Sequence, residues 1–250
     1  IVDGSFSLST DDDGIHAENT LTIENGDILI NKCYEGLEAT DIILNGGSVV
    51  LTSSDDGINA TVGTSSEMLE PRGPGGGETV QDCSVTISGG ILVLYSSGDG
   101  LDSNGTMNIS GGQVIVHGPS ADNNGALDCN GTFEISGGLL IAAGSSRMTE
   151  TPSSSSSQYS VLVEFNSSLG TNTLFNLQSE SGENIVTFKP AHSYQAVNIS
   201  LPELKNGESY SIFNGGNVSG NEFNGVYSEE TYSSGNKYAD FTISSVNTIL

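Results

Sequence analysis

The sequence has very few basic residues. Six Lys and Arg stand against 31 Asp and Glu, so the 250-residue chain carries a formal charge of −25 although only 15% of its residues are charged. Nucleic-acid binding depends on Lys and Arg that neutralise phosphates, and anionic lipid headgroups are repelled by the same surface. The composition therefore excludes nucleic acid and membrane surfaces as partners, and it favours cations.

Other common features are missing as well. There is no Trp, and no stretch approaches the roughly 20 apolar residues of a transmembrane helix, so we expect no membrane insertion. The three cysteines, Cys33, Cys83 and Cys129, are odd in number and lack both a CxxC spacing and a spacing with histidine. This argues against a disulfide framework and against a zinc site. We expect the cysteines to be small core or surface residues.

Glycine, in contrast, is abundant and belongs to a repeat. Phrases such as DDDGIHAENTLTIENGDILI and YEGLEATDIILNGGSVVL recur about every 21 to 22 residues. One gap is about two periods long, and an inserted loop rich in Pro and Gly, residues 63–81, accounts for it. Such a period, with three short β runs per unit, is typical of a solenoid whose coils bury their apolar faces against one another. The index glycines of the five units are Gly14, Gly36, Gly57, Gly100 and Gly125.

Each unit alternates apolar and polar residues and then turns. The turn is a Gly-Gly or Asn-Gly pair, which is typical of a backbone with positive φ. Such pairs also occur in hairpins, but three runs in about 22 residues fit parallel stacking better. We therefore predict an all-β protein with a parallel β-helix over residues 1–146. Its first apolar column consists of Ile15, Leu37, Ile58, Leu101 and Leu127.

The third run of each unit is apolar on both faces, and a strand of this kind is covered on both sides. Residues 147–158 have the composition of a Ser-rich linker. Residues 159–250 hold strand-like runs between Gly, Asn and Pro turns, which predicts a small antiparallel β unit. We expect this unit to pack on the β-helix, to cover its outward apolar stripe and to cap its last coils. The stripe consists of Leu29, Val50, Val93, Ile115 and Ile141.

The acidic residues gather around the index glycines. Residues 1–146 hold 21 acids and two bases, and stacking of the coils would turn acids at equivalent positions into ladders. Neighbouring strands lie about 4.8 Å apart, where two like charges repel by roughly 3 to 4 kcal/mol at an effective dielectric of 20. Ca²⁺ would relieve this repulsion because it takes about 6 to 8 oxygen ligands at flexible geometry. The alternative is a solvated acidic face without a bound ion.

The predicted Ca²⁺ ligands stand one or two residues before the index glycine, or two residues after it, with Asp128 three residues after Gly125. They are not spaced as in an EF-hand loop. The column directly before the glycine reads Asp13, Glu35, Asp56, Asp99 and Asn124. The predicted ligands are Asp12, Asp13, Glu35, Glu38, Asp55, Asp56, Asn59, Asp99, Asp102 and Asp128. The three histidines, His16, His117 and His192, are isolated in the sequence, and we expect them to be ordinary polar residues.

Several long phrases resemble a known family. KCYEGLEATDIILNGGSVVLTSSDDGINA, SGDGLDSNGTMNISGGQVIVHG and FKPAHSYQAVNISLPELKNGESYSIFNGG are similar to the bacterial secreted carbohydrate-binding β-helix family, which is related in fold to pectate lyases. The resemblance extends over nearly the whole chain. It implies a right-handed parallel β-helix with bound calcium, secretion or attachment to the cell surface, and binding of plant cell-wall polysaccharides such as cellulose or acidic pectic sugars.

The resemblance to pectate lyases raises the question of catalysis. These enzymes abstract a proton with a Lys or Arg base beside Ca²⁺, and such a base needs a lowered pKa. Only Lys32, Arg72 and Arg147 are available in or next to the β-helix, and the acid beside Lys32 would raise its pKa instead. We therefore predict non-catalytic, calcium-dependent carbohydrate binding without a catalytic residue. A calcium-dependent polysaccharide lyase is one alternative, and a structural adhesin or surface spacer is another.

The sugar-contacting residues are the least constrained part of this prediction. Without Trp, a flat aromatic platform is not evident, so binding would rely on hydrogen bonds and on bridging cations. The candidate carbohydrate-binding residues are Lys32, Tyr34 and Arg147.

Overall fold

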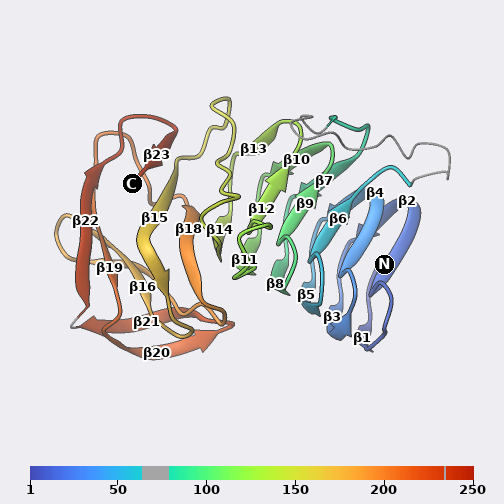
Figure 1. Cartoon of the computed structure of the whole chain (residues 1–250), viewed down its shortest axis with the longest axis horizontal. Helices are drawn as coiled ribbons and strands as arrows, with labels where there is room; N and C mark the ends of the chain where they lie inside the picture. Colours follow the sequence, from blue (N-terminus) through green and yellow to red (C-terminus); the bar gives the residue numbers. More distant parts are fainter. Residues whose placement is uncertain (64–78, 234) are drawn as a thin grey trace.

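The computed structural model describes residues 1–63, 79–233 and 235–250, and within these ranges it consists of β-strands, turns and loops (Figure 1). No helix in the described part of the chain is long and apolar enough to cross a membrane. The strands of the repeat region are β1 (Ser5–Leu8), β2 (Ile15–Ile23), β3 (Asp27–Cys33), β4 (Leu37–Leu44), β5 (Ser48–Ser53), β6 (Ile58–Ala60), β7 (Ser84–Ile87), β8 (Ile91–Ser96), β9 (Leu101–Ser103), β10 (Thr106–Ile109), β11 (Gln113–His117), β12 (Leu127–Cys129), β13 (Phe133–Ile135) and β14 (Leu139–Gly144). They are followed by β15 (Ser160–Leu169), β16 (Phe175–Ser179), β17 (Asn184–Phe188), β18 (Tyr194–Ser200), β19 (Ser209–Asn214), β20 (Asn217–Phe223), β21 (Val226–Ser233), β22 (Asn236–Thr242) and β23 (Asn247–Ile249).

Strands β1 to β14 stack as a parallel solenoid. One sheet begins β1-β3-β5-β8-β11-β14, and each neighbouring pair in that series is parallel. In the second sheet, β4 pairs with β2, β6 and β7, so β7 completes the coil that the insertion at 63–81 interrupts. Residues 64–78 of this insertion lie outside the described residues. The predicted parallel β-helix is confirmed.

The alternation within each run places the apolar columns inside the coils. Leu37, Ile58 and Leu101 are at most 1% exposed, and the equivalent side chains of the other runs join them in one continuous core. The cysteines belong to the same core as free thiols, and burial raises the pKa of each to about 11. Of the two expected placements, core or surface, the structure has Cys33, Cys83 and Cys129 in the core.

Two different constraints explain the glycines of the repeat. A Cβ on the index residue Gly36 would lie 2.1 Å from the carbonyl oxygen of Gly57 in the next coil, so the coils approach too closely there for a side chain. In the turns, the second glycine of each pair has a positive φ, which is +77° at Gly47. This left-handed conformation is strained for residues with a Cβ. The predicted positive φ at the turns is therefore confirmed.

The C-terminal strands continue the solenoid and also cover it. Strand β18 pairs antiparallel with β14, β15 pairs antiparallel with β18, and β23 adds parallel to β15. Strand β14 of the last coil therefore is not an unpaired sheet edge, which would attract other strands. The remaining strands form a six-stranded antiparallel sheet of order β20-β21-β17-β16-β19-β22, at the left of Figure 1. The predicted antiparallel unit is present.

The outward apolar stripe is covered over the later coils. Val93, Ile115 and Ile141 are 0% exposed and form a second core with C-terminal side chains such as Phe188. Leu29, at the other end of the stripe, remains 44% exposed. The expected cover therefore extends over the coils next to the C-terminal unit but does not reach the first coil.

The Ser-rich segment 147–158 lies along β13. The N–H of Ser157 donates to the carbonyl of Ile135, and the N–H of Ile135 donates to Ser156 Oγ at 3.0 Å. Ser156 and Gln158 are buried. The segment thus supplies backbone and hydroxyl partners to the last strand of its sheet, a role that its composition did not indicate.

Candidate functional site

The register of the coils brings the acidic positions into ladders. The residues two places after the index position form an unbroken column across β2, β4, β6, β9 and β12. Each of them is the direct pairing partner of the next one in the neighbouring coil. All members except the exposed His16 are partly buried, so the ladder is not a fully solvated face. In order, it consists of His16, Glu38, Asn59, Asp102 and Asp128.

The ladder before the index glycine requires one correction. Leu101 pairs with Leu127, and Gly100 donates its N–H to the carbonyl of Gly125, so Ala126 occupies the index column in the fifth coil. The earlier assignment of Gly125 to that column was wrong by one residue, because the constraint there is a small side chain and alanine also satisfies it. The ladder therefore ends at Gly125 and does not include Asn124. Its members are Asp13, Glu35, Asp56, Asp99 and Gly125.

Two carboxylates of this ladder accept backbone hydrogen bonds from the following coil. The N–H of Asp99 donates to Asp56 Oδ1 at 2.7 Å, and the N–H of Gly125 donates to Asp99 Oδ1 at 2.5 Å. Burial raises the pKa of Asp56 to about 7, and the negative charges of Asp99, Asp55 and Glu35 add to this effect. The centre of the ladder is thus crowded with carboxylates in a partly buried corner.

Asn59 lies beside this crowded centre. Its Nδ2 donates to Glu35 Oε2 at 2.9 Å, and burial raises the pKa of the Glu35 carboxyl in spite of that hydrogen bond. The other amide atom, Asn59 Oδ1, is buried and accepts no hydrogen bond from the described residues. A buried acceptor without a donor costs about 1 to 3 kcal/mol. Such an atom, among carboxylates, suits a cation.

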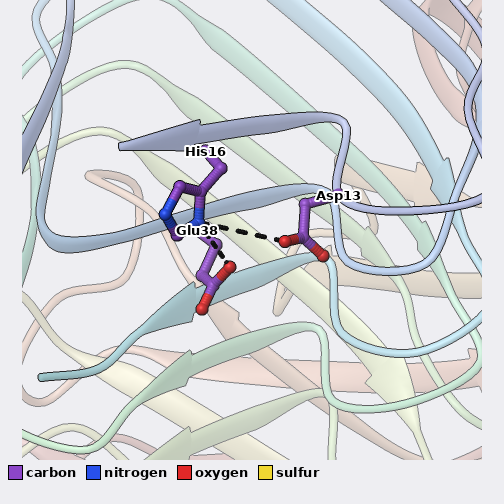
Figure 2. Close-up of side chains that lie close together, drawn as sticks. All are labelled: Asp13, His16 and Glu38. Atoms are coloured by element: carbon purple, nitrogen blue, oxygen red, sulfur yellow. Dashed lines mark hydrogen bonds and ion pairs between the residues drawn. The ribbon is translucent and has the colours of Figure 1, made fainter. Parts of the chain in front are cut away.

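At the first corner, Asp13, His16 and Glu38 converge (Figure 2). His16 Nδ1 lies 2.7 Å from Glu38 Oε2 and 3.9 Å from Asp13 Oδ2. The hydrogen bond to Glu38 raises the pKa of His16, while burial and the neighbouring Asp13 raise the pKa of Glu38. The expectation that His16 is an ordinary isolated polar residue is wrong, because its column partner and its own turn supply two carboxylates. Its position in the ladder was the signal that could have found it.

The outermost predicted ligands lie at the edge of the ladders. Asp12 is exposed, and its carbonyl accepts the N–H of Tyr34. Asp55 is partly buried, and its N–H donates to the carbonyl of Tyr34 at 3.0 Å. These backbone contacts hold the three residues in successive coils of the same corner.

The three candidate sugar-contacting residues do not form one cluster. Tyr34 is 49% exposed, and a hydrogen bond with Asp55 raises its pKa. Lys32 pairs with Asp11 near Tyr34, whereas Arg147 follows the fifth coil, where its Nε lies 3.1 Å from Asp122 Oδ2. Arg72 lies outside the described residues. Lys32 and Tyr34 therefore share the corner of the acidic ladders, and Arg147 lies at its far end.

The fold and this corner define the chain as a β-solenoid with acidic ladders. A family model described as "Carbohydrate-binding domain-containing protein" matches residues 1–68, about a quarter of the chain. The matched segment includes β1 to β6 and the first three coils of the ladders. No curated protein and no solved structure matches the chain. The family match supports carbohydrate binding.

Proposed function

We propose that the chain binds carbohydrate through Ca²⁺ ions held at the corner of the two acidic ladders. The observation that carries this proposal is the combination of partly buried carboxylates in register with the buried Oδ1 of Asn59, which accepts no hydrogen bond from the residues that the structure describes. Carboxylate and amide oxygens are ligands that Ca²⁺ prefers. The residues that would hold the ions are Glu35, Asp55, Asp56, Asn59, Asp99 and Asp102.

The electrostatics of the corner favour a cation. Glu35, Asp56 and Asp99 stand in successive coils, and burial, together with repulsion from the neighbouring carboxylates, opposes ionisation of Asp56. A bound divalent ion would remove this penalty and would supply a coordination position for sugar hydroxyl or carboxylate oxygens. The chain's own contribution to sugar binding would be hydrogen bonds from exposed side chains of the corner, such as Tyr34 and Lys32.

The ligand class follows from the charge. An acidic polysaccharide is repelled by a chain of net charge −25 unless cations bridge the two. We therefore propose acidic pectic sugars of the plant cell wall as the preferred ligand and cellulose as a second one. Such ligands occur outside the cell, which makes secretion or cell-surface attachment part of the same proposal.

The test is retention of the full chain on insoluble pectate and on cellulose, with Ca²⁺ and with chelator. We expect retention in Ca²⁺ that chelator abolishes and that Asp56→Asn with Asp99→Asn weakens. Glu203→Gln is the matched control because Glu203 is an exposed acid of the C-terminal unit, outside the ladders. Retention that is unchanged by chelator would refute the calcium role, and absence of retention on either polymer would favour a structural spacer.

The lyase alternative has a separate readout. Of the basic residues in or next to the β-helix that the structure describes, Lys32 pairs with Asp11 and Arg147 with Asp122. Both cationic groups are thus engaged by a carboxylate of the chain and are not held ready to take a proton from a sugar. We expect no unsaturated products from polygalacturonate in Ca²⁺, and their appearance, followed by ultraviolet absorbance, would show that the chain is a lyase.

A further inference from the structure

In the ladder that lies two residues after the index position, the first member, His16, differs chemically from the others. His16 contributes an imidazole where the following coils contribute side chains with oxygen ligands. Asp13 and His16 come from the first corner and β2, and Glu38 reaches them from β4 (Figure 2). A nitrogen ligand and two carboxylates from adjacent coils thus point toward one another.

The distances among these three side chains suit one small ion. One ligand atom from each residue lies within 4.8 Å of the other two, and His16 Nδ1 is 2.7 Å and 3.9 Å from the carboxylate oxygens of Glu38 and Asp13. Ligands at about 2.0 to 2.1 Å from a tetrahedral ion are about 3.3 Å apart. Shifts of about 1 Å or less per side chain would therefore bring all three atoms to bonding distance of a common centre.

The surroundings also resemble those of a metal ligand. The second ring nitrogen, His16 Nε2, lies 3.7 Å from Glu18 Oε1, and metal-bound histidines usually present that N–H to a carboxylate, a carbonyl or water. Asp13 and Glu38 are 19% and 22% exposed, whereas His16 is 45% exposed, so the site opens toward solvent on the imidazole side. Next to Glu38 in the ladder, the buried Asn59 Oδ1 has no donor among residues 1–63, 79–233 and 235–250, so this part of the corner has acceptors in excess.

We propose that Asp13, His16 and Glu38 bind a divalent transition-metal ion such as Zn²⁺. Imidazole with carboxylates suits Zn²⁺ and its neighbours in the first row, whereas Ca²⁺ takes oxygen ligands. The ladder then has two kinds of cation site, a nitrogen-containing one at its first corner and all-oxygen ones beyond it. This site does not depend on the proposed calcium or carbohydrate binding. The competing explanation is a protonated His16 that pairs with both carboxylates and binds no metal.

Co²⁺ as a spectroscopic probe separates these two explanations. The full chain, stripped with chelator and held in millimolar Ca²⁺ to fill oxygen sites, is titrated with Co²⁺ and followed by visible absorption. We expect one equivalent of Co²⁺ to bind with ligand-field bands that Zn²⁺ abolishes by displacement. His16→Asn introduces the side chain that the same ladder has at Asn59, and it should lower the Co²⁺ affinity at least about tenfold. The control His192→Asn, remote from the corner, should leave the affinity unchanged.

Several results would overturn the proposal. The proposal is contradicted if the wild type and His16→Asn have equal Co²⁺ affinities. It is also contradicted if Ca²⁺, and not Zn²⁺, displaces the bound Co²⁺, or if no ligand-field bands are seen. If circular dichroism shows that His16→Asn is unfolded, the test is made on the wild-type chain by NMR. We expect Zn²⁺ to shift the ring resonances of His16, and unshifted resonances would refute the site. Retention of His16→Asn on pectate in Ca²⁺ is measured in parallel, so failure of this site and failure of carbohydrate binding are distinguishable.

Discussion

Among single residues, Asp56 best reports the crowding of the acidic corner. Its pKa rises from 3.8 to about 7, mainly through burial. A carboxyl whose pKa is higher in the folded chain contributes stability below pH 3.8 and loses it as the pH rises through about 7. Without Ca²⁺, we expect the free energy of unfolding to decrease between pH 4 and pH 7 by up to about 1.4 kcal/mol per pH unit on account of this group. Denaturant titrations in chelator, compared with Asp56→Asn, measure it.

The comparison isolates Asp56 because asparagine keeps the Oδ1 acceptor for the N–H of Asp99. We expect the variant to have a shallower pH dependence than the wild type, and Ca²⁺ to reduce the difference between them. Identical pH profiles of the two proteins in chelator would show that Asp56 titrates normally.

The histidines provide a second prediction for single residues. His117 is buried between the rings of Tyr95 and Phe188, with centroids 4.4 and 5.0 Å away, and its Nδ1 accepts the N–H of Ala191. Burial lowers the pKa of His117 to about 4, whereas the hydrogen bond to Glu38 raises that of His16 above 6.5. In chelator, the NMR titration midpoint of the His117 ring should therefore lie below the ordinary value of 6.5, and that of the His16 ring should lie above it.

The consequence for stability also has a definite sign. A base whose pKa is lowered by folding contributes stability above its unfolded value of 6.5 and loses it as the pH falls toward 4. Because His117 on β11 contacts Phe188 on β17 and residues 191 and 224, acid should first loosen the C-terminal cover. A His117 resonance that titrates near pH 6.5 would contradict this burial.

At the scale of structural elements, the close approach of coils predicts a sharp difference between two glycines. A Cβ at Gly36 would lie 2.1 Å from a backbone oxygen, whereas a Cβ at Gly170 would meet only Thr173 Oγ1 at 3.8 Å. Gly36→Ala should therefore destabilise the chain by about 1 to 3 kcal/mol or more, and Gly170→Ala by less than about 0.5 kcal/mol. Denaturant midpoints measure both, and equal midpoints would show that the coils can separate without cost.

The outward stripe provides the matching test for the C-terminal cover. Ile115 on β11 and Leu29 on β3 occupy the same column of one sheet, with β5 and β8 between them, yet Ile115 is 0% and Leu29 44% exposed. Ile115→Ala should cost about 2 to 5 kcal/mol of unfolding free energy because it leaves a cavity under the cover. Leu29→Ala should cost much less. Similar costs for the two variants would mean that the C-terminal unit does not rest on this stripe.

Periodic features of the solenoid could be predicted from the sequence because each has a local physical cause. Alternation determines which side chains point inward, and positive φ accounts for Gly47 and its equivalents. The index position was misassigned in the fifth coil because glycine was used as the marker, whereas the structure requires only a small residue and has Ala126. The contacts of residues 147–158 with β13 are not periodic, so composition alone could not predict them. His16 was missed because its carboxylate partners come from another coil and a turn.

At the scale of the whole molecule, the charge of −25 is concentrated along the solenoid. Residues 1–146 hold 21 acids and two bases, and the ladders bring several of the acids in the described part of this range into successive coils. Self-repulsion of this kind destabilises the compact state, and bound cations that select the folded chain stabilise it. Under the proposed function, one corner of the fold links stability, cation binding and carbohydrate binding.

The most direct test of this connection is the affinity for an acidic pectic oligosaccharide, measured by calorimetry over a series of free Ca²⁺ concentrations. If Ca²⁺ at the ladder bridges chain and sugar, the affinity should rise with Ca²⁺ and level off above the Ca²⁺ dissociation constant at which the melting temperature of the chain begins to rise. Asp56→Asn with Asp99→Asn should shift both curves to higher Ca²⁺. An affinity that does not change with Ca²⁺ would contradict the account.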